Sequence, residues 1–145
     1  YAEITELAKA CPCRVEFLGR LNHTELAYEL NKSDVFVLPS FYEGLPLVII
    51  EAMACGLKVV CTDLPGIQNW LNANLPNNQV VFVAPPKMKN EDEPLPEELP
   101  DFEQRLAEAI LFAKDTKVLQ EYILKTISWD GLCDRLLKLW NIENI

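Results

Sequence analysis

Short runs of hydrophobic residues alternate along this chain with longer segments of helical spacing. Four runs, at residues 14–18, 34–39, 57–62 and 79–83, have the length and composition of β-strands. The runs at 34–39 and 57–62 are almost uninterrupted, which is typical of strands buried on both faces of a parallel sheet. We therefore predict that these four segments are strands of one sheet.

The segments between and after these runs predict helices. Their ranges are 4–10, 24–32, 47–55, 67–73 and 102–113, with a further, interrupted helix over 117–140. We expect Thr24 to cap the second helix, Gly56 to end the third, and Ser128 to cap the helix after the interruption. The alternation of strand and helix predicts an α/β fold with a mainly parallel sheet flanked by helices.

Residues 85–100 differ from the rest of the chain in composition. Prolines and acidic residues dominate this segment, which lacks hydrophobic periodicity. Two interpretations are open: an acidic arm that binds a partner, or a solvated connection. The second is favoured, because charge runs are usually solvated. We expect a long, mobile surface loop here.

The composition adds limits on function. Of the 145 residues, 50% are hydrophobic and 24% are charged, and the formal net charge is −9. This charge argues against nucleic-acid binding, which needs clustered basic residues. The odd number of cysteines, five, favours reduced thiols in the cytoplasm. With His23 as the single histidine, a zinc site is not expected. We expect Cys55 and Cys61 to be buried as small hydrophobic residues, and Trp129 and Trp140 to be packing residues.

Neither a membrane span nor a signal peptide is indicated. No hydrophobic run approaches the roughly 20 residues that cross a bilayer, and residues 1–10 have no apolar core of a signal. Because the first residue is not Met, we expect the sequence to be part of a longer chain.

Three loops are expected to meet at one edge of the sheet. Ligands of open α/β sheets bind outside the carboxyl ends of the strands. Residues 19–22, 40–46 and 62–66 each follow a predicted strand. A ligand site at this edge is therefore predicted.

Glu51 is the one charged residue in the helix predicted over 47–55, which is otherwise apolar all round. Such a helix should be buried, and a buried carboxylate without a partner is energetically costly. Two arrangements are open. Either a distant basic side chain pairs with Glu51, or the carboxylate faces a cleft and accepts hydrogen bonds from ligand hydroxyls, such as those of a ribose or hexose.

Glu43 lies in the loop before this helix and is followed by Gly44, Leu45 and Pro46. Gly44 permits tight backbone geometry and a close ligand approach, and the start of the helix offers free N–H groups to a diphosphate. The local pattern thus suggests a nucleotide-like ligand. The simpler alternatives are a salt-bridged surface Glu43 and an end-of-helix Glu51.

Residues 33–66 resemble the signature of the group 1 family of retaining, nucleotide-sugar-dependent glycosyltransferases, which have the GT-B fold. The family's E-x7-E motif is matched by Glu43 and Glu51, with Ser33-Asp34 before the strand and Gly56 after the helix. Residues 15–19 and 128–140 resemble further parts of the same family. The resemblance implies a Rossmann-like domain that transfers a sugar from a nucleotide-sugar donor with retention of anomeric configuration.

The resemblance also implies roles for individual residues. Glu51 would bind the ribose hydroxyls, and Glu43 would contact the transferred sugar and stabilise charge at its anomeric carbon. Backbone amides of Gly44, Leu45 and Leu47 would hold the sugar and diphosphate. The loop containing Gly19, Arg20 and Leu21 would line the base pocket. No metal and no other cofactor would be needed.

The same resemblance implies that residues 1–145 are only part of a C-terminal nucleotide-sugar-binding domain. The family's N-terminal acceptor domain and two strands of the sheet are not found in the sequence. We expect a rearranged four-stranded sheet, strand exchange between copies, or strands supplied by missing segments. We also expect the isolated fragment to be inactive.

The resemblance leaves other points of function open. The acceptor can be a saccharide, a lipid or a protein, and peripheral membrane contact through the missing domain is also left open. The stretch 65–69 departs from the family pattern, which puts a role for Asn69 in doubt. The alternative is a non-catalytic nucleotide-sugar-binding module.

Overall fold

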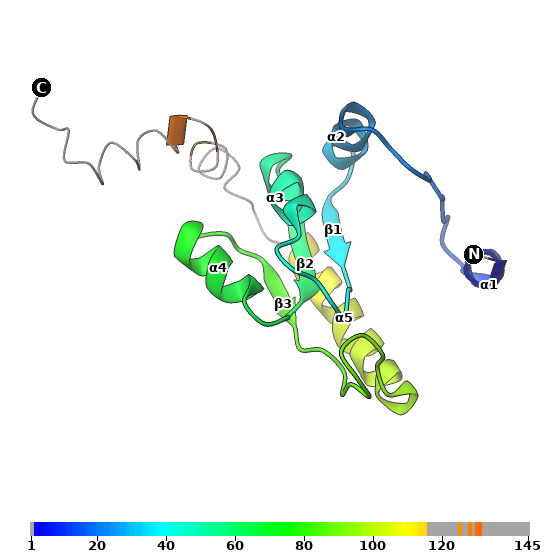
Figure 1. The fold of residues 1–145 in the computed structure, drawn as a ribbon. Helices are drawn as coiled ribbons and strands as arrows, with labels where there is room; N and C mark the ends of the chain where they lie inside the picture. Colours follow the sequence, from blue (N-terminus) through cyan, green and yellow to red (C-terminus); the bar gives the residue numbers. More distant parts are fainter. Residues whose placement is uncertain (1, 116–124, 126–127, 129, 132–145) are drawn as a thin grey trace, which may run out of the picture.

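The computed structural model describes residues 2–115, 125, 128, 130 and 131. Its elements, in chain order, are α1 (Ala2–Ala10), α2 (His23–Asn31), β1 (Val35–Leu38), α3 (Leu47–Ala54), β2 (Lys58–Thr62), α4 (Ile67–Asn74), β3 (Val81–Val83), a 3₁₀ turn η1 (Pro96–Glu98) and α5 (Leu99–Lys114). Figure 1 shows these elements around one small sheet.

The sheet is parallel and has the order β1-β2-β3 among the described residues. Val37 pairs with Val60 across the first interface, and Cys61 pairs with Phe82 across the second. The central strand β2 is the most buried of the three, in agreement with its nearly continuous hydrophobic sequence. The prediction of an α/β fold with a parallel sheet flanked by helices is confirmed.

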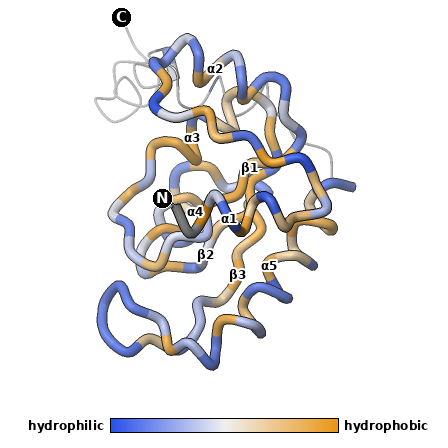
Figure 2. The backbone as a smooth tube through the Cα atoms, turned by 90° about the vertical axis from the view of Figure 1, so that its right-hand side faces the viewer, coloured by the Kyte–Doolittle hydropathy of each residue, from blue (hydrophilic) through white to orange (hydrophobic). Residues whose placement is uncertain are grey.

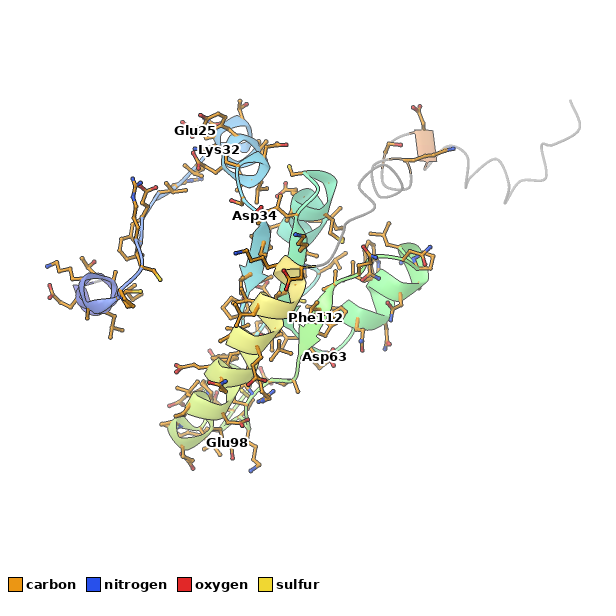
Figure 3. All side chains as sticks on the ribbon, turned by 180° about the vertical axis from the view of Figure 1, so that it is seen from behind. Glu25, Lys32, Asp34, Asp63, Glu98 and Phe112 are labelled. Carbon is orange, nitrogen blue, oxygen red and sulfur yellow. The ribbon has the colours of Figure 1, made fainter. Side chains whose placement is uncertain are left out.

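Two hydrophobic clusters lie on the two faces of the sheet. Val59 and Cys61 of β2 pack in a cluster with Ile49 and Met53 of α3 and Leu71 of α4. The residue between them in sequence, Val60, faces the other way and packs with side chains of α5. This alternation follows from the two-residue period of a strand. Helices α3 and α4 thus cover one face of the sheet, and α5 covers the other (Figures 1 and 3).

Helix α5 packs against all three strands of the sheet. Figure 3 shows it from behind, from the region of Glu98 at its start to Phe112 near its end. The predicted apolar stripe is confirmed, since all its members belong to the cluster on this face: Phe102, Leu106, Ala109, Ile110 and Ala113. Phe112 lies off the stripe and is 64% exposed.

The prediction of a strand at 14–18 is wrong. These residues are not part of the sheet, and Val15, Phe17 and Leu18 are each about half exposed. A strand needs the backbone groups of a neighbour, and hydrophobic alternation alone does not supply one. In Figure 1 this segment and α1 extend away from the sheet, so the expected four-stranded sheet is reduced to three strands.

The start of α2 also differs from the prediction. Asn22, not Thr24, is the N-cap. The Asn22 side-chain oxygen accepts a hydrogen bond of 3.0 Å from the Glu25 backbone N–H, and the Glu25 carboxylate accepts one of 2.9 Å from the Asn22 N–H. This reciprocal pair is a capping box, which fixes the helix start two residues before the predicted cap.

The other predicted helix ends agree better. Cys55 caps α3, and Gly56 follows in the left-handed conformation that favours glycine (φ 85°). The Ser128 hydroxyl accepts a hydrogen bond of 3.2 Å from the Gly131 N–H, which is the expected capping contact. The remainder of the helix predicted over 117–140, with Trp129 and Trp140, lies outside the described residues.

The acidic segment forms a small hairpin and not an irregular loop. Met88 and Pro94 form an antiparallel bridge, and η1 follows and leads into α5. We refer to residues 87–95 as the acidic hairpin; Figure 2 shows its tip as a hydrophilic (blue) stretch. Lys87 and Glu98 form an ion pair of 2.6 Å at its base, and this hydrogen bond raises the pKa of Lys87.

None of the helices in the described part of the chain is long and apolar enough to cross a membrane.

Candidate functional site

A pocket of about 250 Å³ lies at the carboxyl edge of the sheet. Its lining comes from the segments that follow the three strands: Phe41, Tyr42 and Glu43 after β1, Leu64 and Pro65 after β2, and Glu91 after β3. Two of the three predicted loops, 40–46 and 62–66, therefore meet here. The expected third loop, 19–22, does not contribute to this pocket, because residues 14–18 are not a strand of the sheet. The acidic hairpin takes its place.

Glu43 is held in this pocket by its own loop. The Ser40 hydroxyl donates a hydrogen bond of 2.8 Å to the Glu43 carboxylate. Phe41, between them, packs its ring edge against the ring of Phe102 in α5, with 5.3 Å between ring centroids. Within the described ranges, Glu43 forms no ion pair. The alternative prediction, a surface Glu43 in a salt bridge, is therefore wrong for this part of the chain.

The start of α3 lies directly after this loop. Pro46 is the N-cap, and no side chain caps the helix start. Leu45 and Leu47 are 39% and 66% exposed. A Cβ at Gly44 would meet nothing within 4 Å, and Gly44 is not among the glycines with positive φ. Gly44 thus supplies open space beside the backbone amides, and its backbone does not adopt the left-handed conformation that favours glycine.

The expectation that α3 is buried all round is wrong. Ile49, Ala52 and Met53 are buried, but Leu47 is exposed and the Glu51 side chain is 42% exposed. The reason is geometric: α3 packs on one face of a three-stranded sheet, so its opposite side faces outward. Glu51 is therefore a partly solvated carboxylate on the outer side of the helix.

His23, the first residue of α2, approaches Glu51. Its Nδ1 lies 3.9 Å from the Glu51 Oε1, and its side chain is 97% exposed. This distance is too long for a hydrogen bond, and the pair is ionic only when the imidazole is protonated. The structure combines parts of the two arrangements that were open for Glu51. His23, which is distant in sequence, lies near the carboxylate, and the carboxylate remains accessible to solvent.

The residues predicted to line a base pocket lie elsewhere. Gly19 has a φ of 68°, in the left-handed region that favours glycine. Leu21 lines a separate hollow of about 440 Å³ with Thr24, Glu25, Tyr28 and Glu29 of α2. Arg20 is exposed. Within the described residues, this hollow and the Glu43 pocket share no lining residue.

A second hollow adjoins the Glu43 pocket. It has a volume of about 360 Å³ and shares Leu64 and Pro65 with that pocket. Gly66, Gln68 and Asn69 at the start of α4 line the rest, together with Asp63 and Pro85. Asn69, whose role the sequence left in doubt, thus lies in the first turn of a helix that begins beside the pocket.

Two cysteines lie in or beside the core near these elements. Cys61 in β2 is 1% exposed, as predicted, and burial, with a smaller contribution from Asp63, raises the pKa of its thiol to about 12. Cys55 is only partly buried, and the Asn31 side-chain amide lies 3.6 Å from its sulfur. In the described part of the chain, no three His, Cys, Asp or Glu side chains are grouped so that they could hold a metal ion.

Sequence reasoning did not assign functions to Ser40, Tyr42 or Glu91. Ser40 and Tyr42 are close to Glu43 in sequence, and their position in the same loop is the feature that could have indicated a role at the site. The location of ligand sites at the carboxyl ends of parallel strands indicates the segment after β3, but it does not single out Glu91 among the acidic residues there.

Comparison with known proteins places the chain in a family. The family model described as "Glycosyl transferases group 1" matches residues 1–113. The O-antigen chain mannosyltransferase B of Escherichia coli is 42% identical over 53 residues, which are 37% of this chain and 14% of that protein. A subunit of the phosphatidylinositol N-acetylglucosaminyltransferase of Schizosaccharomyces pombe is 26% identical over 132 residues, which are 88% of this chain and 25% of that protein.

A solved structure supports the same conclusion. Sucrose-phosphate synthase from Thermosynechococcus elongatus matches with a TM-score of 0.57 and 26% identity, over 97% of this chain and 33% of that one. In these three comparisons, the chain spans a third or less of the length of the relative. Since the family model covers most of the sequence, the chain belongs to the group 1 glycosyl transferases.

Proposed function

We propose that this chain carries the donor site of a retaining, nucleotide-sugar-dependent glycosyltransferase of the GT-B fold. One observation supports this most: Glu43 lines a pocket at the carboxyl edge of the sheet, directly before the start of α3, and Glu51 lies on the accessible side of that helix. The two glutamates would act as the family's E-x7-E pair. The transferred sugar would bind at the first glutamate and the nucleotide near the second.

Glu51 would hold the ribose of the donor. A carboxylate has two acceptor oxygens, which suit the two vicinal hydroxyls of a ribose. Its partial exposure leaves these oxygens within reach of a ligand, and its neighbour His23 offers a further hydrogen-bonding group on the same side. The base would lie toward the turn at Gly19, Arg20 and Leu21, close to His23 in sequence.

The diphosphate would bind at the start of α3. Backbone N–H groups at a helix start carry partial positive charge and are free to bind an anion. Here the cap is Pro46, no side chain occupies those groups, and Leu45 and Leu47 are exposed. We propose that these amides, with that of Gly44, hold the diphosphate and stabilise it as it leaves, without a metal ion.

Glu43 would act on the transferred sugar. Its carboxylate would accept hydrogen bonds from sugar hydroxyls and stabilise the positive charge that develops at the anomeric carbon. The hydrogen bond from Ser40 fixes one of its oxygens at 2.8 Å and leaves the other for the ligand. The rings of Phe41 and Tyr42 beside it offer an apolar surface to the C–H groups of a sugar.

The names of the relatives support sugar transfer, but they do not identify the donor sugar. Their names specify a mannosyl group in one protein and an N-acetylglucosaminyl group in another. We propose transfer of a sugar as the shared activity, with the donor sugar set by residues around Glu43.

We propose that the complete protein supplies further strands and an acceptor domain. Within the described residues β1 pairs on one side only, and all four of its residues are half-buried. An edge strand with apolar side chains is a site where another strand can add. Strands supplied by the rest of the protein would complete the sheet at this edge.

The proposed function is tested on the complete protein with nucleotide sugars. Release of nucleoside diphosphate, with and without EDTA, measures turnover and the need for a metal. NMR of the first-formed product measures its anomeric configuration. Turnover that survives EDTA and gives a retained product is expected. An inverted product would contradict retention, and binding of nucleotide sugars without turnover would indicate a binding module.

A further inference from the structure

The acidic hairpin has a defined backbone. The Lys89 N–H donates to the Glu93 carbonyl at 2.8 Å, and the Leu95 N–H donates to the Lys87 carbonyl at 2.9 Å. These bonds flank the bridge between Met88 and Pro94. The hairpin therefore holds its tip, residues 90–92, in a fixed direction.

Asn90 orders this tip. Its side-chain oxygen accepts hydrogen bonds from the backbone N–H of Asp92 at 3.2 Å and of Glu93 at 2.8 Å. Its side-chain amide donates to the Glu93 carboxylate at 3.0 Å. An Asn that bonds to the backbone two or three residues on is a standard device for closing a turn. The residue enclosed by these bonds is Glu91.

Glu91 lies on the far wall of the pocket that contains Glu43. Glu93 is bound by Lys89 and Asn90, whereas Glu91 has no hydrogen bond or ion pair within the described ranges. The two lysines of the hairpin thus pair with other carboxylates, Lys87 with Glu98 and Lys89 with Glu93, and Glu91 lines the pocket. The pocket consequently has two carboxylates, from loops after β1 and β3, and no basic side chain in its lining.

We propose that Glu91 determines donor specificity, selecting a neutral, hydroxyl-bearing sugar over a sugar that carries a carboxylate. This inference rests on the proposed function. A carboxylate only accepts hydrogen bonds, so a ligand between Glu43 and Glu91 must supply donors, as sugar hydroxyls do. A uronic acid would place a third negative charge beside these two, which is repulsive. At about 250 Å³ the pocket is smaller than the roughly 300–1,000 Å³ typical of sites for drug-sized ligands, which suits one sugar unit.

The test compares Glu91→Gln with Asp92→Asn in the complete protein. Both substitutions remove one negative charge from the hairpin tip, but Asp92 does not line the pocket. The probes are UDP and GDP, and the pairs UDP-glucose with UDP-glucuronate and GDP-mannose with GDP-mannuronate. Calorimetry gives the affinity for each, and the ratio of hexose to hexuronate affinity is the measure of selectivity.

We expect the wild type to prefer the hexose, and Glu91→Gln to reduce that preference by about tenfold, because it removes one of the two charges that repel the hexuronate. Its affinity for the nucleoside diphosphate should not change, because that probe lacks the transferred sugar. Asp92→Asn should leave the ratio at the wild-type value. An unchanged ratio in Glu91→Gln, or an equal change in Asp92→Asn, overturns the inference.

Two further outcomes separate this inference from the proposed function. A wild type that binds neither nucleoside diphosphates nor nucleotide sugars contradicts the proposed function and this inference with it. A wild type that binds both sugars of a pair equally contradicts only the inference. Loss of folding in Glu91→Gln, read from the melting temperature, would also overturn it, since it would show that Glu91 supports the fold.

Discussion

Ser40 donates its hydroxyl hydrogen bond to the Glu43 carboxylate at 2.8 Å, within the loop that joins β1 to α3. The bond connects the end of a strand to the carboxylate that lines the pocket. It restricts the rotamer of Glu43 before any ligand arrives. Such pre-orientation of a charged group lowers the cost of ordering it when the ligand binds.

Ser40→Ala should therefore reduce donor turnover more than nucleotide binding. Loss of a hydrogen bond worth about 1 kcal/mol predicts a roughly fivefold lower kcat/KM for donor hydrolysis. The affinity for nucleoside diphosphate should stay within about twofold. Ser40→Thr keeps the hydroxyl and serves as the control. Equal loss in both variants would show that packing, and not this hydrogen bond, is responsible.

Asn22→Ala should destabilise the fold through the start of α2. Removal of an N-cap typically costs about 1 kcal/mol, and here the Glu25 backbone N–H loses its acceptor, the Asn22 side-chain oxygen. Urea unfolding of the complete protein measures the change. Thr24→Ala is the matched control, because Thr24 lies two residues into the same helix start and is the cap that the sequence pattern suggested. A larger effect for Thr24→Ala would contradict the cap assignment.

Cys61 should resist alkylation until the protein unfolds. It is buried, and its thiol pKa is raised to about 12, so almost no thiolate forms at pH 8. Cys11 and Cys13 are exposed and should react first. Iodoacetamide labelling at pH 8, with the labelled peptides located by mass spectrometry, checks the order. Labelling of Cys61 as fast as Cys11 would contradict its placement in the core.

The same thiol predicts a loss of stability in alkali. The unfolded thiol ionises near its ordinary pKa of 9.0, while the folded one stays protonated to about 12. The unfolded state therefore binds fewer protons between pH 9 and 12, so the free energy of unfolding falls as pH rises, by up to about 1.4 kcal/mol per pH unit. Below pH 9 the thiol adds no pH dependence. Cys61→Ala should have a shallower slope above pH 9 than the wild type, and an identical slope would contradict this.

The fold could be predicted largely from hydrophobic runs. Strands β1, β2 and β3 and helices α3, α4 and α5 fall where the sequence places them, because buried parallel strands and amphipathic helices leave strong patterns. The segment at 14–18 has the same kind of pattern but is not in the sheet. A local pattern reports how a residue would pack, whereas strand formation depends on a partner elsewhere.

The candidate site was predictable in part. The sequence singled out Glu43 and Glu51 because a loop glutamate beside a glycine, and a single charge in an apolar helix, stand out, and the structure places Glu43 in the lining of the pocket. Glu91 was not found, because in an acidic segment no single carboxylate stands out. The sequence wrongly predicted that the helix is buried all round, because the exposure of its outer side depends on how few elements surround α3.

The affinity of the Glu51→Ala variant for nucleoside diphosphate tests the central claim most directly. Calorimetry on the complete protein with UDP, GDP and ADP identifies the nucleotide that the wild type binds, and the variant is then measured with that nucleotide. Glu103→Ala, a charge removed from the exposed side of α5, is the control. We predict at least a tenfold weaker affinity, about 1.4 kcal/mol, for Glu51→Ala only. Because this side chain is partly solvated, the free energy of unfolding should change by less than about 0.5 kcal/mol. An unchanged affinity in a folded Glu51→Ala variant would contradict the assignment of this helix to the donor site.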